Sequence, residues 1–138
     1  MRAPAFPQSY ENRAVAAALE RLVESPGEAT LTALLDAALR GGLTVDVTGS
    51  PSPQELRLRT LQTTDGRQVL PLFTSMKELK ATVDAAGLTG TTVNGIIVPG
   101  RQALGFIETA DFVAVQFNPR RPGGIVAREH ILRAIGRQ

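Results

Sequence analysis

Apolar side chains repeat at helical spacing in two stretches near the start of the chain. In residues 12–24 one stripe collects Val15, Ala18, Leu19, Leu22 and Val23, and Asn12 stands where its side chain can cap the first turn. In residues 31–39, Leu31, Leu34, Leu35, Ala38 and Leu39 follow the i, i+3, i+4, i+7, i+8 pattern. Gly41-Gly42 then stops the pattern. The short join between the two stretches predicts an antiparallel pair of helices.

In residues 56–73 the apolar residues follow a strand pattern instead of a helical one. With the turn signal Thr64-Asp65-Gly66 between the two halves, this predicts a β-hairpin. A two-residue Asp-Gly loop would pair Leu61 with Leu70 and place Arg57 and Arg59 beside leucines of the return strand. A three-residue loop with Gly66 as the bulge residue shifts the pairing by one. We favour the three-residue loop, because it puts Leu56, Leu58, Leu70 and Leu72 on one side and leaves both arginines in water.

A capped helix follows the hairpin. Ser75 and Glu78 have the spacing of a capping box, in which the side chain of each residue accepts a hydrogen bond from the backbone N–H of the other. The helical repeat then runs through Met76, Leu79, Val83 and Ala86, and Gly87 stands at the expected C-terminal glycine position. Pro71, in the return strand, cannot donate to a ladder, so that strand is predicted to be an edge or to be paired on one side only there.

The rest of the chain alternates short strands and helices. We predict strands at 43–47, 112–117 and 125–126, with 112–117 central because it is apolar on both faces, and helices at 99–107 and 128–135. Residues Thr91–Val98 are ambiguous, since Asn94-Gly95 suits a tight turn whereas Ile96-Ile97-Val98 suits a strand. The whole predicts an α+β fold: an extended N-terminal arm at 1–11, then one domain at 12–138 with two N-terminal helices and a mainly antiparallel sheet built on the central hairpin, with helices packed against it.

Composition narrows the class of protein. A chain of 138 residues that is 43% hydrophobic suits one globular domain. No run of 18 apolar residues or signal-peptide pattern occurs, so we expect a cytoplasmic protein without a membrane partner. The absence of cysteine excludes disulfides, thiol nucleophiles and thiolate metal sites.

Three segments resemble the N-terminal domain of the bacterial SseB (enhanced serine sensitivity) family. They are Leu34–Arg40 leading into the strand 43–47; Asp65-Gly66-Arg67 with Leu70-Pro71-Leu72-Phe73-Thr74-Ser75; and Gly100–Leu104 with the strand that ends in Asn118-Pro119. Together they span roughly residues 12–135. Asp46 and Arg120-Arg121-Pro122 depart from the family pattern. The resemblance implies the fold but no catalytic residues.

Most residues that could carry chemistry have a plainer explanation. His130 is predicted to be exposed and has no second histidine or cysteine with which to bind zinc. Glu108 and Asp111 suit a turn better than an acid–base pair. Ser75 is interpreted as a helix cap rather than a nucleophile. The Pro-Gly pair in residues 98–101 could offer backbone N–H groups to an anion, but such a pair is common before a helix. We therefore predict no catalytic, cofactor-binding or metal-binding residues.

The best candidate for recognition is the loop of residues 118–124, in which Arg120 and Arg121 could hold carboxylates or phosphates. The favoured function is a non-catalytic domain that binds a protein partner through these arginines, and self-association is left open. The alternative is an enzyme, or an accessory to one, that binds a small anionic metabolite where Arg101 or this loop meets a carboxylate such as Asp111. Polyanion binding through the basic C-terminal part is a weaker option, and nucleic-acid motifs are lacking.

Overall fold

The computed structural model describes residues 6–52, 55, 57–85, 87, 92–121 and 123–136. Within these residues the helices are α1 (Arg13–Glu24), α2 (Glu28–Arg40), α3 (Met76–Ala85), α4 (Gly100–Gly105), the 3₁₀ helix η1 (Phe106–Thr109) and α5 (Arg128–Gly136). The strands are β1 (Gly42–Asp46), β2 (Leu61–Gln62), β3 (Gln68–Leu72), β4 (Gly95–Pro99), β5 (Ala114–Phe117) and β6 (Ile125–Ala127). None of the described helices combines the length and the hydropathy needed to span a membrane.

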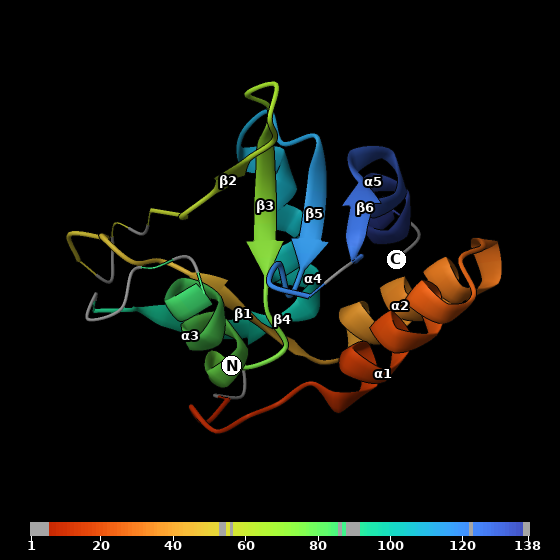
Figure 1. Ribbon diagram of the computed structural model, residues 1–138, viewed down its shortest axis with the longest axis horizontal. Coiled ribbons are helices and arrows are strands. Elements are labelled where there is room, and N and C mark those ends of the chain that lie inside the picture. Colours follow the sequence, from red (N-terminus) through yellow and green to blue (C-terminus); the bar gives the residue numbers. More distant parts are fainter. Residues whose placement is uncertain are drawn as a thin grey trace.

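The strands form two sheets (Figure 1). One sheet pairs β1 with β4 in antiparallel fashion, and the other has the order β2-β3-β5-β6, with β3 and β5 parallel. The sheets are joined where Thr44 and Phe73 exchange backbone hydrogen bonds of 2.9 and 3.0 Å. The predicted α+β class and the two N-terminal helices are confirmed. The parallel pair and the division into two sheets are additions that the strand pattern did not reveal.

The hairpin has the predicted three-residue loop. Leu61 is opposite Val69 and Gln62 is opposite Gln68, and Gly66 adopts a φ of 85°. At the turn, the Thr63 hydroxyl donates to the Asp65 carboxylate, and this bond, together with the Arg67 guanidinium, lowers the pKa of Asp65. The loop length is therefore confirmed, whereas Leu56, part of the predicted leucine face, lies outside the described residues.

The ladder between β2 and β3 is only two residues long, so the residues that flank it make other contacts than those predicted for a longer hairpin. Pro71 is paired with Gln116 of β5 and has no partner on the β2 side, as the missing N–H of proline predicts. Residues 57–60 instead approach β1. The expectation that Arg59 lies in water is wrong, since its Nε is 3.3 Å from the carboxylate of buried Asp46 and its backbone N–H donates to the Asp46 carbonyl.

Asn12 caps α1 as predicted and also fixes the helix to the sheet. Its Oδ1 accepts a hydrogen bond from the Val15 N–H at 3.0 Å, and its Nδ2 donates to the Gly42 carbonyl at 2.8 Å. The assignment of Val23 to the buried stripe is wrong, because 48% of this residue is exposed. The stripe stays in contact with the core as far as Leu22, two residues before the helix ends.

Residues 6–11, the described part of the predicted arm, lie against the start of β1. The Tyr10 hydroxyl accepts from the Gly42 N–H at 3.0 Å, and the rings of Phe6 and Tyr10 are in contact, tilted by 58° with centroids 4.8 Å apart. The Asn12 N–H then donates to the Thr74 carbonyl at 2.8 Å. This segment thus connects the helical pair to the segment that precedes α3.

Helix α3 begins with only half of the predicted capping box. The Ser75 hydroxyl accepts from the Glu78 N–H at 3.0 Å, but the Glu78 carboxylate binds arginine side chains rather than the Ser75 backbone. Gly87 has the predicted left-handed conformation, with a φ of 80°, while Ala86 lies outside the described residues. For the ambiguous stretch, β4 starts at Gly95, and the Asn94 carbonyl accepts from the Val47 N–H, so the described residues 92–94 precede a single strand.

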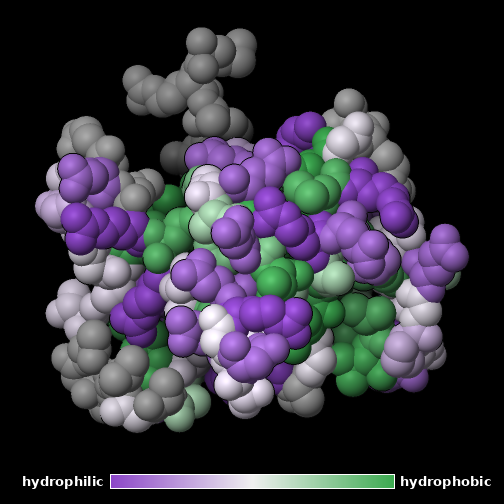
Figure 2. All heavy atoms as spheres, turned by 90° about the horizontal axis from the view of Figure 1, so that it is seen from above, coloured by the Kyte–Doolittle hydropathy of each residue, from purple (hydrophilic) through white to green (hydrophobic). Residues whose placement is uncertain are grey.

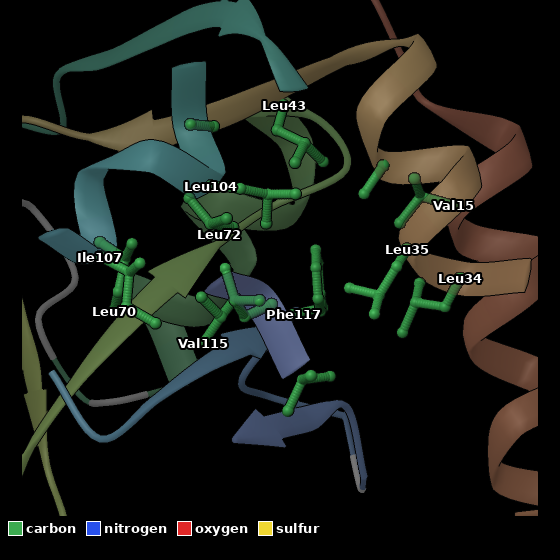
Figure 3. Close-up of a cluster of buried hydrophobic side chains, with 14 of the residues drawn as sticks. Val15, Leu34, Leu35, Leu43, Leu70, Leu72, Leu104, Ile107, Val115 and Phe117 are labelled. Atoms are coloured by element: carbon green, nitrogen blue, oxygen red, sulfur yellow. The ribbon is translucent and has the colours of Figure 1, made fainter. Parts of the chain in front are cut away.

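The main core lies between one face of the β2-β3-β5-β6 sheet and the helices α1, α2, α4 and α5 (Figure 3). Aliphatic side chains, Phe112 and Phe117 fill it; among the fully buried ones are Leu34, Leu43, Leu70, Leu72, Leu104, Ile107 and Ile131. Beneath α3, Phe73, Met76, Leu79 and Val83 form a second, smaller cluster. The core of leucine, valine, isoleucine and alanine holds the functional surfaces in place.

Candidate functional site

A groove of about 590 Å³ lies between α1, α3 and the β5–β6 connection. In Figure 1 this connection passes between α3 on one side and α1 on the other. Helix α1 contributes Ala16, Leu19, Glu20, Val23 and Glu24, whereas α3 contributes Lys77, Glu78 and Ala81. The remaining lining residues are Glu11, Thr74, Ser75, Phe117, Asn118, Arg120, Arg121 and Gly124. The candidate arginines therefore lie at a concave surface.

Both arginines bind one carboxylate, that of Glu78. The Nε atoms of Arg120 and Arg121 lie 3.2 and 3.1 Å from Glu78 Oε1, and Arg121 also donates from its terminal nitrogen to Oε2 at 3.3 Å. Glu78 is only 7% exposed, so its charge requires these partners. The two guanidiniums stabilise the buried acid and hold the loop against α3.

The loop reaches Glu78 because its first residue turns the chain sharply. Asn118 has a φ of 47°, a left-handed conformation that asparagine tolerates better than most residues. Its Oδ1 accepts from the Thr74 N–H at 3.1 Å, and its Nδ2 donates to the Thr74 hydroxyl at 3.2 Å. Gly124, with a φ of 80°, then returns the chain to β6. Two segments 44 residues apart are thus joined at the base of the loop.

The two sides of the groove differ in charge. Glu20 and Glu24 on α1 are exposed and have no ion partner among the described residues. The opposite side carries exposed Lys77 together with Arg120 and Arg121, which share one carboxylate and remain basic on balance. Side-chain exposures of 35% for Arg120 and 58% for Arg121 leave part of each guanidinium accessible. The α1 wall is therefore acidic, and the opposite wall carries three basic side chains together with Glu78. Exposed Glu11, whose backbone pairs with Ser75, adds a negative charge beside the basic wall.

The carboxylate that meets the arginines is not the expected one. Asp111 lies beside the hairpin turn, in a shallow depression with Gly66 and Arg67, and both Asp111 and Glu108 are exposed. Arg101 donates to the Ile135 carbonyl at the end of α5, at 2.8 Å. The pocket predicted for a small anionic metabolite, in which Arg101 or the loop would meet Asp111, is therefore not formed by these residues.

Two other predicted features have structural explanations. The Gly100 N–H, part of the Pro-Gly segment before α4, donates to the Gly41 carbonyl at 2.7 Å. The expectation that His130 is exposed is wrong: it is half-buried, in a depression between α2 and α5 that Glu28, Leu31, Thr32, Leu35 and Arg133 also line. Helical rotation within α5 alone missed this, because it does not include the neighbouring α2, which packs against α5.

Several arginines of the basic C-terminal part have structural partners, whereas Arg133 is exposed. Arg128 Nη1 donates to the carbonyls of Ile107, Ala110 and Phe112 at 2.9 to 3.0 Å, which fixes the connection between η1 and β5. Arg120 and Arg121 are held by Glu78, and Arg137 lies outside the described residues. Among the described residues, no group of three or more His, Asp or Glu side chains gathers as a metal site would require.

The family model of the SseB protein N-terminal domain matches residues 15–132. The chain belongs to the SseB family. A search of curated proteins gives no match. Of the segments that carried the resemblance, the second supplies Thr74 and Ser75 and the third supplies Asn118, so two parts of the SseB pattern meet at the groove. In the sequence, Glu78 was interpreted only as part of a capping box, and the acidic face of α1 was not singled out.

Proposed function

We propose that this SseB domain is a non-catalytic interaction domain and that its protein partner binds in the groove between α1 and α3. Arg120 and Arg121 contribute to that surface together with the exposed side of α1.

The main support is the state of the reactive groups that line the groove. The Ser75 hydroxyl caps α3, the Glu78 carboxylate binds two guanidiniums, and the Asn118 amide is bonded to Thr74. Each of these groups already has a structural partner. What the groove offers to a ligand is accessible surface, including the half-exposed Val23, and such a surface supports binding rather than bond-making.

Two matched substitutions test the proposal. Val23 and Ile125 are large apolar residues that are 48% and 63% exposed, but only Val23 lines the groove. Val23→Asp should abolish capture of a specific partner from the native cell, because a carboxylate would have to be desolvated at the contact. Ile125→Asp should leave capture unchanged.

The readout is mass spectrometry of proteins retained by the wild-type chain and by each variant, with circular dichroism to verify folding. If the two variants retain the same specific proteins as the wild type, the groove is not the interaction surface. If only Ile125→Asp loses the partner, the interaction surface lies at β6 instead.

A further inference from the structure

We propose that the groove accepts an amphipathic α-helix of a partner protein, with basic side chains along one border and acidic side chains along the other. This inference rests on the proposed function and specifies the partner. It follows from three properties of the groove: its helical walls, its narrow apolar strip and the opposite charges of its two sides.

The walls have the geometry of a helix-binding surface. Ala16, Glu20, Val23 and Glu24 follow one another at helical spacing along α1, and the strip from residue 16 to residue 24 is about 12 Å long at 1.5 Å per residue. Ala81 of α3 faces the groove from the other side. Small and medium apolar residues between two helices allow a third helix to approach closely, over about two turns.

An extended peptide fits this surface less well. Strand addition requires a free sheet edge whose backbone groups can pair with the ligand. The strand that reaches the groove is β5, through Phe117, and it is already paired with β3 on one side and β6 on the other. A helix satisfies its own backbone hydrogen bonds and needs only side-chain contacts, which the groove provides.

The charges define the borders of the ligand. Glu20 and Glu24 are one turn apart on α1 and favour basic side chains facing them. Lys77, Arg120 and Arg121 favour acidic side chains on the opposite border, since Glu78 occupies only part of each guanidinium. A uniformly acidic ligand would be repelled by the α1 side, and a uniformly basic one by the other side.

Three synthetic peptides of about 14 residues provide the test, each with the same Ala/Leu face. Their polar borders are Glu on one side and Lys on the other, Glu on both sides, or Lys on both sides. Fluorescence anisotropy gives the affinities, and amide chemical shifts of the full chain locate the binding. The mixed peptide should bind roughly tenfold more tightly than the other two, with shifts confined to α1, α3 and residues 118–121.

Charge reversal on each wall supplies the controls. Glu20→Lys and Lys77→Glu change exposed residues on opposite walls, so both variants should fold normally. Both should weaken binding of the mixed peptide, each by roughly three- to tenfold. If the all-Glu peptide binds most tightly and Glu20→Lys strengthens it, the groove is an anion site and the inference is wrong.

Other outcomes separate this inference from the proposed function. If none of the peptides binds the groove, the inference fails, while the interaction role survives provided that Val23→Asp still abolishes capture of the native partner. A concentration-dependent dimer in sedimentation that Val23→Asp removes would assign the groove to a second copy of the chain and would also overturn the inference.

Discussion

Two pairs of helices differ in how closely they approach each other. Helices α2 and α4 are in direct contact, whereas α1 and α3 are separated by a groove. Between α2 and α4 the backbones touch: an added Cβ at Gly100 would lie 1.6 Å from the Ala38 carbonyl oxygen. Between α1 and α3 lies the groove of about 590 Å³, which is bordered by charged side chains from both walls and from the β5–β6 loop. Both regions contain residues of the SseB pattern. Figure 2 shows another face of the molecule, on which hydrophilic residues predominate and hydrophobic residues are visible between them.

A residue of the SseB pattern can either pack in the core or shape a surface. Its neighbours in the tertiary structure determine which of the two it does. Gly100 is buried and needed for close approach, which leaves it no role in binding. Thr74 and Asn118 are also buried, yet the hydrogen bonds between them position the loop that carries the accessible arginines.

Gly100→Ala should have the largest effect. Because the new methyl group would overlap a backbone carbonyl, the two helices must separate, and we expect a loss of more than about 3 kcal/mol in the free energy of unfolding. Urea denaturation measures this loss.

Gly105→Ala is the matched control in the same helix. A Cβ at Gly105 meets no atom within 4 Å, so this substitution should be neutral or stabilise the protein by up to about 1 kcal/mol. Similar losses for the two alanine variants would mean that helix α4 is sensitive for reasons other than the α2 contact.

Replacement of both Arg120 and Arg121 by alanine should have the next largest effect. The Glu78 carboxylate would then be buried without an ion partner, at a cost of about 2–3 kcal/mol. The double variant therefore confounds loss of binding with loss of stability. Thermal and urea unfolding, measured beside the binding assays, reveal the second contribution.

Adding Glu78→Gln to the double variant isolates the cause. A neutral amide at residue 78 costs less to bury, so the triple variant should recover most of the lost stability without regaining the basic wall of the groove. A triple variant as unstable as the double one would show that the arginines stabilise the loop through other contacts.

Single arginine substitutions should have smaller and unequal effects. Arg59 is the ion partner of buried Asp46, which also accepts from the Thr48 N–H, so Arg59→Ala should cost about 1–2 kcal/mol. Arg121→Ala leaves Arg120 on Glu78 and should cost about 0.5 kcal/mol. Equal losses in urea denaturation would contradict the idea that two arginines share the Glu78 charge redundantly.

Local chemistry made much of the fold predictable. The cap at Asn12, the three-residue hairpin loop at Gly66, the glycine at 87 and the central position of residues 112–117 all follow from backbone preferences or hydrophobic pattern, and the structure confirms them. The predicted exposures of Val23, Arg59 and His130 were wrong, because exposure depends on neighbours remote in sequence. The candidate site was found only in part, since Arg120 and Arg121 were selected without their partner Glu78.

The amino-acid sequence alone predicted the caps, the hairpin turn and the type of most helices and strands, because these signals act over a few residues; the observed ends of β2 and β5 differ from those predicted. It also carried the membership of the SseB family. Only the tertiary structure decided that α1 borders the same groove as α3, that Glu78 leaves its expected backbone partner for two arginines 42 and 43 residues away, and that one wall is acidic and the other basic. These are matters of packing and charge between distant segments, and the energies that settle them arise only when the chain is folded.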